Sequence, residues 1–421
     1  MKKETAAIHA GYNKDSQGTM AVPIYQTTAF AFESAQQASD RFCLQDLGNI
    51  YTRLTNPTTA ILEERLAALE GGASAIATSS GQAAIFYAVA NLYEAGDNII
   101  VSDKIYGGSV TLFKYTMKRL GLDARVFDLD NPETIEALID DKTKAIYFES
   151  LSNPQIAVAD IDAISAIAKK YGIVSICDNT VATPYLINPI EHGTDIVVHS
   201  CSKYMSGQGL ALGGAIIDRD GLTEFFKNNP RYPHFSTPDA SYHGLVYTDL
   251  PFPAFNLRIR LALLRDIGAT PSPFNSWSLI QSLETLALRM EKHCSNGLKI
   301  AEYLESNPQV FNLNYPGLKS NKYHALANKY FKDGLSSGLI SFEVKDKATA
   351  WKILDETKIF SIVVNIGDSK SILTHPSSTT HQQIPLDEQN KIGITEGLIR
   401  VSVGLEDTSD LIADLETAFN A

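Results

Sequence analysis

The stretch Val197-Val198-His199-Ser200-Cys201-Ser202-Lys203-Tyr204 places a lysine just after a short apolar run that has the length of a buried strand. An earlier run, Ile173 to Cys177, has the same character and is followed by Asp178. Short apolar runs with polar ends are typical of strands that are buried on both faces of a parallel sheet. The sequence therefore predicts a sheet in which Asp178 and Lys203 both follow strand ends.

Short apolar strands alternate with helical segments over about residues 57–220. Strands are expected over 75–77, 98–101, 124–127, 144–148, 173–177, 195–199 and 213–217. Helices are expected from 57 to about 70 and over 82–93, 110–120 and 160–171, and a further helix is expected to begin at 132. This alternation predicts an α/β fold with a mainly parallel sheet that is covered by helices on both faces.

The pattern divides the chain into three parts. Residues 1–55 lack a clear period and are expected to form an N-terminal arm, and residues 56–255 form the large sheet domain. Residues 256–421 begin with an expected helix over 276–295 and continue as a smaller α/β domain. The segment 222–256 is rich in aromatic residues and is expected to be a long ordered loop beside a pocket.

Composition excludes several classes of protein. The 421 residues are 44% hydrophobic and 20% charged, and the net charge is −12, which argues against nucleic acid or an anionic membrane as a partner. Nothing approaches the roughly 18 consecutive apolar residues of a membrane span, and no apolar segment follows the basic N-terminus. The cysteines lack CxxC spacing, so we expect a cytoplasmic protein with reduced thiols and no metal site.

Polar residues follow several of the expected strands, and ligands of open parallel sheets bind at these ends. Ser80-Gly81-Gln82 opens a helix whose N–H groups could hold a phosphate, although an ordinary helix cap has the same appearance. Tyr106, beside two glycines, suits stacking on a flat ligand and is equally compatible with a turn. Asn153 follows the strand 144–148 and could bond to a ring substituent.

Asp178 and Lys203 together indicate pyridoxal phosphate. A carboxylate within about 3 Å keeps a pyridine nitrogen protonated, so that the ring can accept electrons. A buried lysine can form the Schiff base with the cofactor and act as a base once it is displaced. Ser200 and Ser202 could bond to phosphate oxygens. Taken alone, Asp178 could instead be a helix cap and Lys203 a solvated loop residue.

Three other features give weaker signals. The run Gly207 to Gly214 lacks the spacing of a dinucleotide fingerprint, and no phosphate-binding GxxxxGK[ST] motif occurs. Arg400 lies inside an apolar strand, where it should pair with a carboxylate of the protein or of a substrate. His375 and His381 lie in a polar loop and lack further residues that would make a metal site.

Several motifs resemble those of a known family. They are Tyr51-Thr52-Arg53-Leu54-Thr55-Asn56-Pro57-Thr58, Ser80-Gly81-Gln82, Asp178-Asn179-Thr180, Ser200-x-Ser202-Lys203 and Arg400-Val401-Ser402-Val403-Gly404. Together they are similar to the cystathionine γ-synthase family of pyridoxal-phosphate enzymes, also called the Cys/Met metabolism family. The resemblance covers essentially the whole chain. It implies the aspartate-aminotransferase-like fold, known as fold type I.

Within that family the chain most resembles the sulfhydrylases. The matching stretches are Tyr106-Gly107-Gly108-Ser109, Ser272-Pro273-Phe274-Asn275, Asn365-Ile366-Gly367-Asp368-Ser369-Lys370-Ser371, His375-Pro376 and Thr380-His381-Gln382-Gln383. This resemblance implies a γ-replacement in which sulfide or methanethiol displaces acetate from O-acetyl-L-homoserine. Methionine or cystathionine γ-lyase, cystathionine γ-synthase and a non-catalytic regulator that binds pyridoxal phosphate are the alternatives.

The resemblance also implies residue roles. Lys203 would be the Schiff-base lysine, Asp178 the partner of the ring nitrogen and Tyr106 the stacking ring. The residues implied to bind the phosphate are Ser80, Gly81, Gln82, Ser200 and Ser202. Those implied to bind the substrate are Arg400, Asn153 and Asn365. Tyr51 and Arg53 would reach the cofactor of a neighbouring subunit, which implies a dimer with shared sites and, by expectation, a tetramer.

Two positions depart from the family pattern. Gln208 stands where relatives often have histidine, and Val181 stands where phenylalanine is common. Both departures concern substrate preference and not the chemistry.

Overall fold

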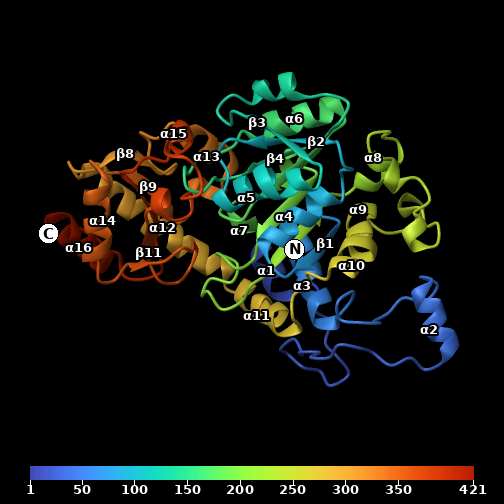
Figure 1. Ribbon diagram of the computed structural model, residues 1–421. Coiled ribbons are helices and arrows are strands. Elements are labelled where there is room, and N and C mark those ends of the chain that lie inside the picture. Colours follow the sequence, from blue (N-terminus) through green and yellow to red (C-terminus); the bar gives the residue numbers. More distant parts are fainter.

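The computed structural model describes residues 1–421 and contains two β-sheets that lie side by side (Figure 1). The larger sheet has seven strands in the order β1-β7-β6-β5-β4-β2-β3. Their bounds are β1 Ser74–Thr78, β2 Asn98–Ser102, β3 Asp123–Phe127, β4 Thr143–Glu149, β5 Val174–Asp178, β6 Ile196–Ser200 and β7 Gly214–Asp218. Every neighbouring pair is parallel except the two pairs that contain β7. The predicted strands and the mainly parallel α/β fold are confirmed.

Alternate residues of these strands enter two separate cores. In β6, Val197 belongs to the core beneath α3 (Pro57–Glu70) and α6 (Ile161–Tyr171), and Val198 belongs to the core beneath α4 (Gly81–Ala90). A strand that is covered on both faces needs apolar residues in succession, which is why these strands appear in the sequence as continuous apolar runs.

Local sequence signals set the ends of the helices that pack on the large sheet. The Asn56 side chain accepts hydrogen bonds from the amides of Thr58 and Thr59 at the start of α3, and Gly71 ends this helix with a φ of 71°. Likewise Asp160 caps the start of α6, and Gly172 ends it with a φ of 62°. Caps of this kind satisfy the free N–H groups of the first turn, and glycine adopts the left-handed conformation without strain.

Three predicted helices differ from the structure. The expected helix over 110–120 is a short helix α5 (Gly107–Thr111) that continues as a π-helix over Leu112–Met117. The segment that begins at Pro132 is a 3-10 helix, Pro132–Leu138. The expected helix over 276–295 is divided into α11 (Pro273–Leu283) and α12 (Leu286–Ser306). At the division the Thr285 backbone is not helical, and the Arg289 side chain donates to the Ser282 carbonyl at 2.8 Å.

The aromatic segment 222–256 was predicted as a loop beside a pocket, and this prediction is wrong. It folds into short helices, including α8 (Leu222–Lys227) and α9 (Ala254–Arg258). The Phe226 and Phe235 rings stack with centroids 4.0 Å apart, and both are fully buried. No residue of the segment lines the cavity described below. Five of its aromatic side chains belong to the hydrophobic core, namely Phe226, Tyr232, Phe235, Tyr247 and Phe255.

The smaller sheet has five strands in the order β10-β11-β12-β9-β8. Their bounds are β8 Phe311–Asn314, β9 Leu339–Glu343, β10 Ser361–Ile362, β11 Ile372–Thr374 and β12 Leu398–Ser402. Three helices, α12, α14 (Lys347–Glu356) and α16 (Thr408–Asn420), pack together beside this sheet. The remaining helices are α7 Thr183–Leu186, α10 Arg265–Ile267, α13 His324–Tyr330 and α15 Leu386–Lys391.

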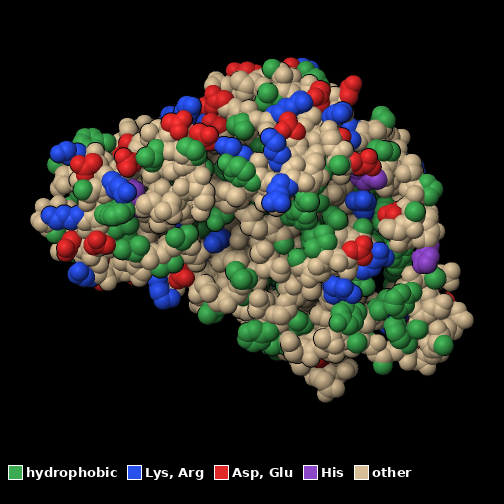
Figure 2. Space-filling view, in the orientation of Figure 1, with side chains coloured by type: hydrophobic (Ala, Val, Ile, Leu, Met, Phe, Trp, Pro, Cys, Tyr) green, Lys and Arg blue, Asp and Glu red, His purple; other side chains and the backbone are tan.

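The N-terminal arm extends away from the two sheets, with α2 (Ala35–Phe42) at its far end (Figure 1). The arm begins with α1 (Lys3–His9), which packs on α3. Several apolar side chains of the arm are exposed, including Met20 at 78%, Phe42 at 56% and Leu47 at 63%. Hydrophobic side chains are visible among the polar surface there (Figure 2). No helix in the structure combines the length and the apolar character that crossing a membrane requires.

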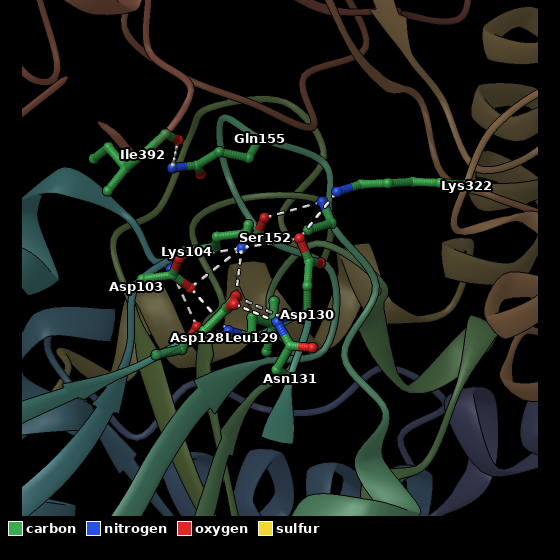
Figure 3. A network of polar contacts seen from close by, with 12 residues as sticks. Asp103, Lys104, Asp128, Leu129, Asp130, Asn131, Ser152, Gln155, Lys322 and Ile392 are labelled. Atoms are coloured by element: carbon green, nitrogen blue, oxygen red, sulfur yellow. Dashed lines mark hydrogen bonds and ion pairs between the residues drawn. The ribbon is translucent and has the colours of Figure 1, made fainter. Parts of the chain in front are cut away.

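A polar network joins the two sheet regions (Figure 3). The Lys104 ammonium, just after β2, lies 3.1 Å from Asp103, 3.4 Å from Asp128 and 3.3 Å from Asp130. Lys322, which follows β8, forms an ion pair with Asp130 at 2.9 Å. The loops at the end of the large sheet are therefore tied to the segment that follows β8 of the smaller sheet.

Candidate active site

A cavity of about 180 Å³ lies where the carboxyl ends of the large-sheet strands face the smaller sheet. Most of the predicted site residues line it, although they are widely separated in the sequence. They are Ser80, Gly81, Gln82, Tyr106, Asn153, Asp178, Ser200, Ser202, Lys203, Asn365 and Arg400. Tyr51 and Arg53 do not line this cavity.

One end of the cavity is suited to a phosphate. Ser80 caps α4, and its hydroxyl accepts a hydrogen bond from the Ala83 amide at 3.2 Å. A Cβ atom on Gly81 would lie 2.5 Å from the Ser200 Cβ, so a larger residue cannot fit between the helix start and β6. The N-terminus of α4 thus brings backbone N–H groups and a positive dipole end against the Ser200 side chain.

Hydrogen bonds among neighbouring residues shape the same end. The Ser202 hydroxyl accepts from the Gly213 amide at 3.0 Å and donates to its carbonyl at 3.2 Å, so it is already engaged with the backbone. The Thr180 hydroxyl accepts from the Ser200 amide at 2.8 Å. Thr180 is not among the predicted site residues, although it belongs to the Asp178-Asn179-Thr180 motif.

Asp178 ends β5, is partly buried and has no lysine or arginine side chain as an ion-pair partner. Its carboxylate accepts hydrogen bonds from the Thr180 amide at 2.9 Å and from the Tyr147 hydroxyl at 3.3 Å. Burial raises the pKa of Asp178, because a charged carboxylate is poorly solvated there. A cationic group in the cavity would therefore be strongly attracted to this carboxylate.

Glu149 is a site residue that the sequence interpretation missed. It ends β4, pairs in register with Asp178 and lines the cavity. Its carboxylate accepts hydrogen bonds from the Tyr106 amide at 2.7 Å and from the Asn153 amide at 3.1 Å. Burial, followed by the nearby Asp178, raises its pKa well above the usual value. Glu149 therefore holds the backbone of two predicted site residues.

Lys203 points its amine into the cavity and donates a 2.7 Å hydrogen bond to the Asn365 side-chain oxygen. Burial, with a contribution from the positive charge of Arg400, lowers the pKa of Lys203 to about 8. An amine with this pKa is neutral in about a tenth of molecules at pH 7, far more than an ordinary lysine. It can therefore act as a nucleophile and as a base.

Arg400 lies in the middle of β12 and is 2% exposed. Its guanidinium donates to the Asn153 side-chain oxygen at 3.1 Å and to the Asn365 carbonyl at 2.7 Å, and the Nε atom has no partner. No protein carboxylate pairs with it, so the alternative of a protein partner does not apply. Arg400 lines the cavity, where a substrate carboxylate would pair with its guanidinium.

Tyr106 stands before α5 at the cavity mouth and is 36% exposed. A Cβ atom on Gly108 would lie 2.5 Å from the Tyr106 ring, and one on Gly107 would lie 2.4 Å from the Thr380 carbonyl. The two glycines therefore allow the ring and the loop that contains Thr380 to approach the same helix start. Thr380 also lines the cavity.

The segment that carries Asn365 packs directly on the loop after Lys203. The Ser369 amide donates to the Gly207 carbonyl at 2.8 Å, and a Cβ atom on Gly367 would lie 2.5 Å from the Tyr204 backbone nitrogen. The Leu405 amide in turn donates to the Ser369 carbonyl at 2.8 Å. This backbone seam connects the lysine loop to the end of β12.

Tyr51 and Arg53 lie together on the arm, away from the cavity of their own chain. The Arg53 guanidinium lies 5.4 Å from the centre of the Tyr51 ring, and this ring is 42% exposed. Both side chains are thus presented on the surface of a single chain.

Pyridoxal phosphate requires a site for its phosphate, a partner for its ring nitrogen and an amine for covalent attachment. A glycine-based helix start with a serine beside it suits a phosphate, and a partly buried carboxylate without a lysine or arginine partner suits a protonated ring nitrogen. A lysine with a lowered pKa lies in the same cavity and suits covalent attachment. The residues fit the cofactor.

Comparison with known proteins agrees with this geometry. The family model described as Cys/Met metabolism PLP-dependent enzyme matches residues 4–420. An O-acetyl-L-homoserine sulfhydrylase of Leptospira meyeri is 46% identical over 99% of this chain and 96% of its own length. A homocysteine/cysteine synthase of Kluyveromyces lactis is also 46% identical, over 99% of this chain and 97% of its own length.

A crystal structure of a Campylobacter jejuni protein, which contains N'-pyridoxyl-lysine-5'-monophosphate, superposes with a TM-score of 0.99. It is 55% identical and covers 100% of both chains. The match spans both sheets and the cavity between them. The chain therefore belongs to the Cys/Met metabolism family of PLP-dependent enzymes.

Proposed function

We propose that this protein is an O-acetylhomoserine sulfhydrylase, which converts O-acetyl-L-homoserine and sulfide to L-homocysteine and acetate. Methanethiol in place of sulfide would give L-methionine. The observation that carries the proposal is the buried Arg400, which forms no ion pair with a protein carboxylate and lines the cavity that also holds Lys203 and Asp178. The printed functions of relatives at 41–46% identity support the same reaction.

When bound, pyridoxal phosphate supplies an electrophilic carbon for the substrate amine and a ring that accepts negative charge from the neighbouring carbons. Arg400 binds the substrate carboxylate, and its position is set by Asn153 and the Asn365 carbonyl. This contact places the substrate Cα beside the Lys203 amine, which removes protons and returns them. Asp178 provides the negative charge that keeps the ring nitrogen protonated.

The other residues hold the cofactor. Ser80, Gly81 and Gln82 offer the N-terminus of α4 to the phosphate, and Ser200 adds a hydroxyl from the end of β6. Ser202 shapes the same loop through its bonds to Gly213. Tyr106 covers the ring face at the cavity mouth.

The assembly belongs to the same proposal. Tyr51 and Arg53 are exposed and lie outside their own cavity, so they are free to complete the phosphate site of a second copy. Exposed apolar side chains on the arm support burial against that copy, since side chains such as Met20 and Phe42 gain stability when they leave water. A dimer is then the smallest complete unit, and a tetramer would be a pair of dimers.

The three parts of the chain have different roles in this proposal. Residues 1–55 form the arm that reaches the neighbour, residues 56–255 hold the cofactor, and residues 256–421 supply the substrate contacts Asn365 and Arg400. We further propose a cytoplasmic enzyme, in keeping with its reduced cysteines.

The direct test uses the purified, cofactor-loaded enzyme with a panel of O-acetyl, O-succinyl and O-phospho esters of homoserine, and with O-acetylserine. Each ester is incubated with sulfide, and the thiol product and released acid are quantified. We expect O-acetylhomoserine to give the highest kcat/KM of these esters. Release of a 2-oxo acid from L-methionine alone at a comparable rate would favour a γ-lyase and reject the sulfhydrylase.

A further inference from the structure

Glu149 connects two loops of the cavity that are far apart in the sequence. It is the last residue of β4 and is 4% exposed. One of its carboxylate oxygens accepts from the Tyr106 amide at 2.7 Å, and the other accepts from the Asn153 amide at 3.1 Å. Each oxygen therefore holds a different loop, and neither hydrogen bond can replace the other.

The first of these bonds restrains the turn that precedes α5. Tyr106 is the residue before this helix, and its φ of −53° and ψ of 135° are not helical. Gly107 and Gly108 follow, and they have no side chains that could hold the turn in place. The bond from the Tyr106 amide to Glu149 therefore helps to fix the backbone that carries the aromatic ring at the cavity mouth.

The second bond leads to the guanidinium of the small sheet. Glu149 holds the Asn153 backbone, and the Asn153 side-chain oxygen accepts from Arg400 at 3.1 Å. All three residues are buried and line the same cavity. A shift of the Asn153 backbone would move the acceptor that orients Arg400, so the position of this guanidinium depends on Glu149.

Only a side chain with two acceptor oxygens and the length of glutamate can hold both loops. A glutamine has one acceptor oxygen, and its NH₂ group would face the second amide N–H instead of accepting from it. An aspartate keeps both oxygens but is one methylene shorter, so it cannot reach both amides. The two bonds also satisfy a carboxylate that is otherwise costly to bury beside Asp178.

We propose that Glu149 is a positioning residue that couples the cofactor and substrate parts of the site. Through the Tyr106 amide it sets the ring that covers pyridoxal phosphate, and through Asn153 it aligns Arg400 with the substrate carboxylate. The coupling rests on the roles that the proposed function gives to Tyr106 and Arg400. It does not depend on the thiol or the leaving group, so it would also apply to a γ-lyase.

The test compares Glu149→Gln with a matched control, Asp414→Asn. Asp414, in α16, is 8% exposed and does not line the cavity. Like Glu149, it accepts hydrogen bonds only from backbone amides, which belong to Lys358, Ile359 and Phe360. Both substitutions replace a buried carboxylate with an amide of nearly the same shape.

Four quantities are measured for each variant. They are the Kd for pyridoxal phosphate on the apoenzyme, the visible absorbance of the loaded enzyme, the Kd for L-homoserine from the change in this absorbance, and the Tm. L-Homoserine has the substrate carboxylate but no ester to expel, so its binding is read without turnover.

We expect both variants to lower the Tm. Only Glu149→Gln should also raise both Kd values, each by about tenfold, which is the change for the loss of one hydrogen bond. Its absorbance band should shift, because the Tyr106 ring no longer has the same position over the cofactor. Glu149→Asp should give the same two increases, and it provides the answer if Glu149→Gln does not fold.

Three results would overturn the coupling. A folded Glu149→Gln enzyme in which one or both Kd values stay at the wild-type level would show that the two parts of the site are not linked through this residue. Wild-type values of both in Glu149→Asp would show that the charge of Glu149 matters and its reach does not. Equal increases in Asp414→Asn would show that lower stability alone weakens binding.

The variant Arg400→Leu separates this inference from the proposed function. If Arg400→Leu bound L-homoserine as the wild type does, Arg400 would not hold the substrate carboxylate. That result would reject the proposed function together with the substrate half of the coupling. If Arg400→Leu lost L-homoserine binding and Glu149→Gln did not, only the coupling would be wrong.

Discussion

The two sheets contribute to the cavity in different ways. The large sheet presents its polar groups at the ends of parallel strands, where Glu149, Asp178 and Ser200 each end a strand. The small sheet contributes Arg400 from the middle of the antiparallel strand β12. The strand ends of the large sheet form a rigid binding site for a cofactor. The small sheet places the positive charge of Arg400 opposite this site. On this basis we expect the large sheet to govern cofactor binding and the small sheet to govern substrate binding.

The largest effect is expected for Lys203→Ala. Loss of the amine removes the proton transfers and the covalent attachment, so kcat should fall by about 10⁴-fold or more. Far-ultraviolet circular dichroism should remain unchanged, because Lys203 makes one side-chain hydrogen bond. Normal turnover by the variant would show that Lys203 has no role in the mechanism. It would also contradict the view that the large sheet carries the reacting groups.

Asp178→Asn should have the next largest effect. The amide leaves the ring nitrogen without a negative partner, so we expect kcat to fall by about 10³-fold, a loss comparable to that of one strong electrostatic contact in an active site. The Kd for pyridoxal phosphate should rise in parallel. If kcat fell while cofactor affinity stayed at the wild-type value, the large sheet could not be described as the cofactor holder.

Arg400→Leu should affect the substrate and spare the cofactor. Loss of a charged hydrogen-bond pair costs about 1.5–3 kcal/mol, so kcat/KM should fall by roughly 10- to 150-fold. The fall should appear mainly in KM. The cofactor Kd and absorbance should not change, and Arg400→Lys should recover part of the loss. Weaker cofactor binding in Arg400→Leu would break the proposed separation between the sheets.

The smallest effect concerns Asp218, a buried carboxyl group on β7 that does not line the cavity. Burial raises its pKa to about 7, against the bonds from Ser74. The folded protein then binds more protons than the unfolded chain between about pH 4 and 7, so the free energy of unfolding falls as the pH rises through this range.

Asp218→Asn removes this titration. The variant should gain about 2 kcal/mol relative to the wild type between pH 5 and pH 8, which can be measured by urea unfolding at both pH values. Turnover should stay at the wild-type level, in contrast to Asp178→Asn. An equal free-energy difference at both pH values would contradict the raised pKa.

Much of the large sheet could be predicted because each of its strands has a local signal in the sequence. Continuous apolar runs mark strands that are buried on both faces, and residues at their ends must meet at one edge. Asp178 and Lys203 were found in this way. Asn365 came only from the family resemblance, since no local pattern places it beside Lys203.

Other features depend on pairing between distant segments. Glu149 was missed because its importance arises from its register with Asp178 and from two backbone amides in other loops. The segment 222–256 is predicted as an ordered loop beside a pocket, because aromatic residues suit both a pocket and a core. Composition alone does not distinguish these environments, whereas the stacked Phe226 and Phe235 do.

The backbone seam between the lysine loop and the end of β12 has a consequence for hydrogen exchange. The amide protons of Ser369 and Leu405 are both held in this seam, by the Gly207 and Ser369 carbonyls. These protons exchange with solvent only when the bonds open locally. A carboxylate that binds to Arg400 should slow such opening, so deuterium uptake at these two amides would report substrate binding without any turnover.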